Sequence, residues 1–107
     1  MGEPLITMKP TKTEKAMLKR LAKENRKRLT EIMEERDEET LTADGFDAGI
    51  VGITEASPLR VVYDYHTCVR VLMAVDGMSE EDALEHMNFN VTGSYVGDQT
   101  PVFIYSL

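Results

Sequence analysis

The chain has 107 residues, of which 42% are apolar, and a formal net charge of −7. This length suits one small globular domain, and the negative charge argues against nucleic-acid binding over the whole surface. A single cysteine excludes an internal disulfide framework, and no apolar run reaches the roughly 20 residues needed to span a bilayer. The first residues lack the pattern of a signal peptide. We therefore expect a cytoplasmic protein without a membrane partner.

The charges are strongly segregated along the chain. Residues 9–28 hold nine of the twelve Lys and Arg residues against two acids, a local charge of +7. Residues 31–107 hold three basic residues against sixteen acidic ones, a local charge of −13. This asymmetry predicts two surfaces with different electrostatic roles, and it points to an interaction protein without identifying the partner.

Residues 1–12 contain Pro4 and Pro10 and show no periodicity, so we expect an irregular lead-in there. A helix is predicted over residues 13–37, with Thr13 as its N-cap. Its apolar residues recur at three- and four-residue steps, which is typical of an amphipathic helix. These residues are Leu18, Leu21, Ala22, Leu29, Ile32 and Met33.

Five basic residues, four within this segment and one directly before it, fall on an adjacent face of the helix. They are Lys12, Lys15, Lys19, Lys23 and Arg26. Such a stripe suits an acidic protein surface or a phosphate backbone, and it is equally the pattern of a solvated helix face. No aromatic residue is interleaved within the helix, so base stacking is not supported. The stripe is our candidate for partner or nucleic-acid binding.

The apolar face also contains Asn25, a polar residue that can set register and partner number when helices pair. Homodimerisation through this face is one hypothesis, with a candidate self-association set of Leu18, Ala22, Asn25, Leu29 and Ile32. The alternative is that Asn25 lies at the boundary between helix and domain. The rest of the chain is too short to be comfortably stable alone, so the helix either docks on it or pairs with another copy.

After an acidic linker over residues 38–44, residues 45–107 are predicted to form a compact β-β-α-α-β unit. Strands over residues 49–54 and 59–66 form a hairpin, and helices follow over 67–76 and from Ser79 to about Gly93. A strand over residues 101–105 closes the unit. The fold class is α+β, and we expect a small antiparallel sheet with helices on one face.

Residues 45–103 contain several short motifs: Gly45-Phe46-Asp47-Ala48, Val62-Tyr63-Asp64, Asp76-Gly77-Met78-Ser79 and the stretch from Phe89 to Phe103. On these motifs the chain resembles a group of small, poorly characterised proteins encoded by bacteriophages and prophages, most specifically over Phe89–Phe103. The resemblance implies a phage-type accessory protein acting in the host cytoplasm. It does not cover the basic helix.

Asp64, His66 and Cys68 alternate along the end of the second predicted strand. A Cys–His pair with a carboxylate is the minimum for nucleophilic catalysis, so these residues are a distant candidate active site. A simpler interpretation is that Asp64 or Thr67 caps the following helix while Cys68 is buried. We expect no cofactor and no metal, because one Cys and two distant His residues do not make a zinc site.

These observations favour a non-enzymatic protein that binds a macromolecular partner through charged surfaces. The expected partner is a protein, and the target class suggested by the phage resemblance is a host defence or nucleic-acid-processing complex. The alternative is a nucleic-acid-binding protein that uses the basic helix.

Overall fold

The computed structural model describes residues 8–107, and its longest element is helix α1 (Lys12–Arg36). Its N-cap is Thr11, whose Oγ1 accepts a hydrogen bond from the Glu14 amide at 3.1 Å. The prediction of Thr13 as the cap was wrong, because Thr11 and Glu14 have the three-residue spacing of a capping box. Residues 8–11 of the expected lead-in lack helix or strand, and residues 1–7 lie outside the described residues.

Helix α1 ends in a left-handed turn at Asp37, which has a φ of 49°. The Asp37 amide donates to the Glu34 carbonyl at 3.2 Å, and the Glu38 amide donates to the Met33 carbonyl at 3.0 Å. This pattern is a Schellman motif, in which Asp takes the place usually held by glycine. It redirects the chain onto the body of the protein.

The segment predicted as an acidic linker has no regular structure but is tied to the sheet. The Glu38 carboxylate accepts a hydrogen bond from the Leu59 amide at 2.5 Å, and the Thr40 hydroxyl donates to the Leu59 carbonyl at 2.6 Å. Further along, the Ala43 amide donates to the Tyr63 hydroxyl at 2.8 Å. Residues 38–44 are therefore held against β2 and the turn before it by hydrogen bonds, and we call this segment the strap.

A three-stranded sheet follows, in the order β1 (Ile50–Ile53), β2 (Val61–Asp64), β3 (Val102–Ile104), and it is preceded by a 3-10 turn η2 (Asp47–Gly49). Strands β1 and β2 are antiparallel, as the predicted hairpin requires. Strand β3 is parallel to β2, so the prediction of an antiparallel sheet was wrong for this pair. A crossover connection explains the difference, since helices carry the chain back before β3 begins.

That connection contains α2 (Tyr65–Ala74), α3 (Glu80–His86) and a single π-helical turn, η3 (Met87–Val91). Asp64 caps α2, which begins at Tyr65, two residues before the predicted start. Ser79 caps α3, because its Oγ accepts a hydrogen bond from the Asp82 amide at 3.1 Å. The two predicted helices are confirmed.

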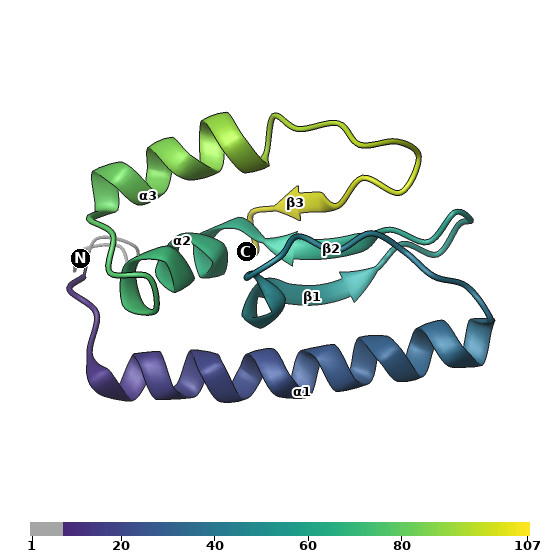
Figure 1. Cartoon of the computed structure of the whole chain (residues 1–107), viewed down its shortest axis with the longest axis horizontal. Helices are drawn as coiled ribbons and strands as arrows, with labels where there is room; N and C mark the ends of the chain where they lie inside the picture. Colours follow the sequence, from purple (N-terminus) through teal and green to yellow (C-terminus); the bar gives the residue numbers. More distant parts are fainter. Residues whose placement is uncertain (1–7) are drawn as a thin grey trace.

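Figure 1 shows α1 along one side of the molecule, the sheet and α2 in the middle, and α3 on the opposite side. The core lies between these layers and includes Leu18 and Leu29 of α1, which are 4% and 2% exposed. A bidentate ion pair between Arg70 of α2 and Glu14, with nitrogen–oxygen distances of 2.8 and 2.6 Å, ties the first turns of α1 to α2. The α+β class is confirmed, and the long helix docks on its own domain.

Candidate functional site

The basic residues predicted from the sequence divide into two groups in the structure. Lys12, Lys15, Lys19 and Lys23 are exposed on α1, whereas Arg26 is half-buried. The Nε and Nη2 atoms of Arg26 each lie 3.0 Å from a carboxylate oxygen of Asp47. The hydrogen bond to Asp47 raises the pKa of Arg26. Arg26 thus fastens α1 to η2 and is not part of the free stripe.

Arg20 and Lys27, which sequence reasoning left out of the stripe, are also exposed on the outer side of α1. We define the basic face as six exposed residues: Lys12, Lys15, Lys19, Arg20, Lys23 and Lys27. Within residues 8–107, none of the six forms an ion pair. At 1.5 Å of rise per residue the basic face extends about 22 Å along the helix. The basic face is therefore an elongated positive surface whose side chains form no ion pairs with the described residues.

The residues proposed for self-association face the chain's own core. Leu18 and Leu29 are buried, and Ala22 and Ile32 are half-buried on the same side of α1. The Asn25 Nδ2 atom lies 2.9, 3.3 and 3.2 Å from the main-chain carbonyl oxygens of Asp47, Ala48 and Ile50. Asn25 therefore lies at the boundary between helix and domain. Dimerisation through this face would require α1 to leave its own domain.

Asp64, His66 and Cys68 have separate roles, because the chain becomes helical at Tyr65 and the strand alternation ends there. The Asp64 carboxylate accepts hydrogen bonds from the Thr67 amide at 3.1 Å and from the Thr67 hydroxyl at 2.6 Å. Cys68 is fully buried, and burial raises the pKa of its thiol to about 12. His66 is exposed. No hydrogen bond joins any two of these three described side chains, so they do not form a nucleophile–base arrangement.

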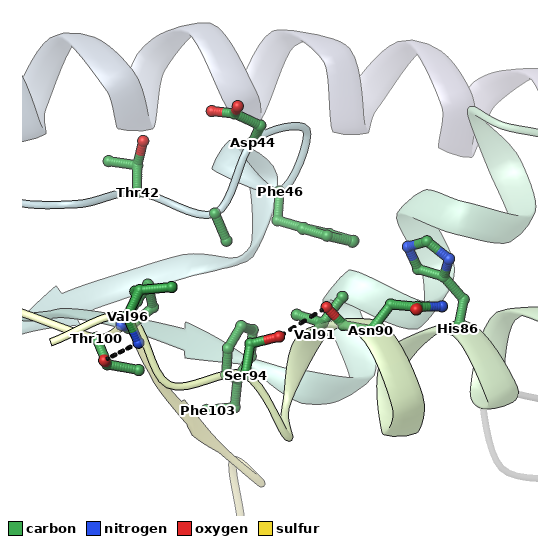
Figure 2. A pocket seen from close by; sticks show the side chains of 12 residues that line it. Thr42, Asp44, Phe46, His86, Asn90, Val91, Ser94, Val96, Thr100 and Phe103 are labelled. Carbon is green, nitrogen blue, oxygen red and sulfur yellow. Dashed lines mark hydrogen bonds between the residues drawn. The ribbon is translucent and has the colours of Figure 1, made fainter.

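A cleft of about 320 Å³ lies between the strap that follows α1 and the segment from α3 to β3. Figure 2 shows its two walls, with Thr42, Asp44 and Phe46 on one side and residues of the η3–β3 segment on the other. Its apolar lining consists of Ala43, Phe46, Val91, Val96, Pro101 and Phe103. This volume is at the lower end of the range of small-ligand pockets. The sequence did not predict this site, because its walls are separated by about forty residues along the chain.

The floor of the cleft is rigid. Phe103 stacks on Tyr63, with ring centroids 5.3 Å apart, and the Tyr63 hydroxyl is held by the Ala43 amide. Burial raises the pKa of Tyr63 to about 12, so its hydroxyl stays neutral at physiological pH. On the η3–β3 wall, the Ser94 hydroxyl donates to the Asn90 main-chain carbonyl at 3.1 Å (Figure 2).

Polar groups line the rest of the cleft. They are Thr42, Asp44, His86, Asn90, Ser94 and Thr100. Among the described residues that line it there is neither Lys nor Arg, and Asp44 is the only acidic and His86 the only basic side chain. Two aromatic residues that adjoin lining residues along the chain, Phe89 and Tyr95, are each 77% exposed, and Tyr95 lines a separate hollow beside Pro58. Exposed aromatic side chains beside an apolar hollow are typical of interaction surfaces.

Within residues 8–107 no group of His, Cys, Asp and Glu side chains is arranged to hold a metal ion. None of the described helices combines the length and apolarity needed to cross a membrane.

The chain matches no protein-family model, and no curated protein or solved structure is significantly similar to it. The resemblance to phage and prophage proteins thus depends on the quoted motifs alone and stays an expectation.

Proposed function

We propose that this protein is a non-enzymatic binding protein whose basic face on α1 contacts an acidic surface of a protein partner. The observation that carries the proposal is the division of α1 into two faces. One face is fixed to the domain through Leu18, Leu29 and Asn25, while six cations on the other side have no ion-pair partner among the described residues.

A docked helix has a rigid backbone, so its cations are held in a fixed spacing before a partner arrives. Preorganisation of this kind reduces the entropy lost on binding. Complementary charge also accelerates encounter with an acidic partner. The basic face thus has the geometry of a recognition surface, and the phage resemblance suggests inhibition of a host defence or nucleic-acid-processing complex as the biological role.

A nucleic-acid partner is the second candidate, because a row of cations about 22 Å long can follow a phosphate backbone. Two features make it the weaker one. The basic face contains no aromatic residue for base stacking, and residues 31–107 carry a local charge of −13 that repels a polyanion.

Charge reversal on α1 tests the proposal. Lys23→Glu changes the basic face, whereas Arg28→Glu makes the same charge change about 140° around the helix, at 100° per residue. Both residues are exposed, so both variants should fold. We expect a host protein that co-purifies with the wild type to be retained by Arg28→Glu and lost with Lys23→Glu. Equal retention by both variants would contradict the proposal.

A gel shift with duplex DNA separates the two candidates. A complex that forms at low salt, weakens steeply between 50 and 200 mM salt and is lost with Lys23→Glu would favour the nucleic-acid candidate, since counterion release drives such binding. The protein-binding proposal predicts no shift at physiological salt.

A further inference from the structure

We propose that the cleft between the strap and the η3–β3 segment is a docking site for a peptide of a partner protein, one that presents a bulky apolar side chain beside a lysine or arginine. This site lies on a different surface from the basic face of α1 and has the opposite charge preference. The inference therefore goes beyond the proposed function and does not depend on it.

The size and lining of the cleft fit one large side chain. About 320 Å³ of space is bounded by Phe46 on one wall and by Val91 and Phe103 on the other, so both walls offer apolar contact (Figure 2). Burying an aromatic side chain against such a surface removes apolar area from water and is favourable. The floor is preformed, because the Phe103 ring stacks on the buried Tyr63 ring.

The charge around the cleft selects a cationic neighbour for that side chain. Asp44 lines the cleft and is exposed, and it forms no ion pair with another described residue. No Lys or Arg occurs among the described lining residues, and residues 31–107, which contain the whole described lining, carry a local charge of −13. A lysine or arginine next to the inserted side chain is attracted by Asp44 and by the negative charge of this part of the chain, whereas a carboxylate is repelled.

The surroundings indicate a peptide of a larger partner. Val96 of the lining is 58% exposed (Figure 2), and Phe89 and Tyr95, which belong to the same chain segment but do not line the cleft, are each 77% exposed. A free small molecule enclosed in the cleft would leave these groups in water. A partner chain that continues past the cleft would cover them, and aromatic residues of this kind are enriched at protein interfaces.

The experiment uses the ¹⁵N-labelled full chain and three capped synthetic peptides, Gly-Lys-Phe-Lys-Gly, Gly-Glu-Phe-Glu-Gly and Gly-Lys-Ala-Lys-Gly. Each is titrated to roughly 5 mM, which covers weak single-side-chain affinities, while amide shifts are recorded. We expect the Lys-Phe-Lys peptide to shift amides of residues 42–46 and 90–96. The Glu-Phe-Glu and Lys-Ala-Lys peptides should each bind at least about tenfold more weakly, because one lacks charge complementarity and the other lacks the apolar side chain.

Matched variants locate the binding. Val96→Arg places a cation in the cleft, and Val51→Arg makes the same change on β1 at a position of similar exposure, 58% against 55%. Val96→Arg should weaken Lys-Phe-Lys binding at least about tenfold while Val51→Arg leaves it unchanged. Because both valines are exposed, a dispersed spectrum should be retained in each variant.

Three outcomes would overturn the proposal. The first is an absence of shifts in the cleft with the Lys-Phe-Lys peptide. The second is equal binding of the peptides or of the two variants, which would indicate non-specific attraction to an acidic protein. The third is a concentration dependence of the cleft amides in the unliganded chain, which would show that a second copy occupies the cleft.

Discussion

Replacement of Asn25 by leucine tests the docking of α1 most directly. Leucine has the same number and branching of side-chain heavy atoms as asparagine and a higher helix propensity, so the helix itself is not weakened. The change removes the Nδ2 group that bonds the carbonyls of Asp47, Ala48 and Ile50 at 2.9–3.3 Å. Because an amide nitrogen has two hydrogens, the three contacts amount to about two full hydrogen bonds.

At about 1 kcal/mol net for each bond, plus the cost of leaving part-buried carbonyls without partners, Asn25→Leu should lower the free energy of unfolding by about 2–3 kcal/mol. Urea denaturation followed by circular dichroism measures this loss, and the midpoint should fall by about 1–2 M. The control is Glu24→Leu at the neighbouring exposed position, which should change stability by less than about 0.5 kcal/mol. A loss below about 0.5 kcal/mol for Asn25→Leu would refute the assigned role of the amide.

Asn25→Asp provides a second, pH-dependent check on the same contact. A carboxylate cannot donate, and it would face three carbonyl oxygens, so the native state favours its protonated form and raises its pKa. A raised native pKa means that the variant gains stability relative to the wild type as the pH falls. If the free energy of unfolding lost in Asn25→Asp is as large at about pH 4 as at pH 7, this geometry is contradicted.

Three further predictions concern α2 and its contacts. Burial alone would raise the pKa of Asp64, but hydrogen bonds from Thr67 and Ser106 lower it. The stability that the ionised carboxylate provides is complete above about pH 4 and is lost as the pH falls through the native pKa. In a plot of urea midpoint against pH, Asp64→Asn should therefore reduce the fall at acid pH. The buried Cys68 thiol has a pKa of about 12. At pH 8 it should react with iodoacetamide at least about a thousandfold more slowly in the native chain than in the unfolded chain. Rapid labelling of the native chain would show that α2 opens. Glu14→Gln should lower the free energy of unfolding by about 2 kcal/mol, because it weakens the ion pair with Arg70, whose side chain is 10% exposed. The control Glu24→Gln should be nearly neutral, and equal urea midpoints for the two variants would argue against the ion pair.

The elements of this fold were largely predictable from local sequence signals. The three- and four-residue spacing of Leu18, Leu29 and their neighbours marked the buried face of α1, and Ser79 with the acids after it marked the start of α3. The alternation of Leu59, Val61 and Tyr63 marked the buried face of the second strand, and all three are 0% exposed.

The parts that were missed depend on contacts between distant segments. The parallel pairing of β3 is decided by the path of the crossover, which leaves no mark on residues 102–104 themselves. Asn25 bonds to main-chain carbonyls, which any sequence supplies, so its partners had no sequence signature. Arg26 has the spacing of the basic stripe, and its ion-pair partner Asp47 lies twenty-one residues away in the sequence, so the pair could not be predicted.

The division of α1 into a fixed side and a free side affects how the protein can change over generations. Substitutions at Leu18, Asn25 or Leu29 lower the fraction of molecules that are native, and therefore lower abundance in the cell. Substitutions at Lys19 or Lys23 should leave abundance nearly unchanged, because these side chains are exposed and form no ion pair with another described residue. The outer side of the helix can therefore change in sequence while the scaffold beneath it persists.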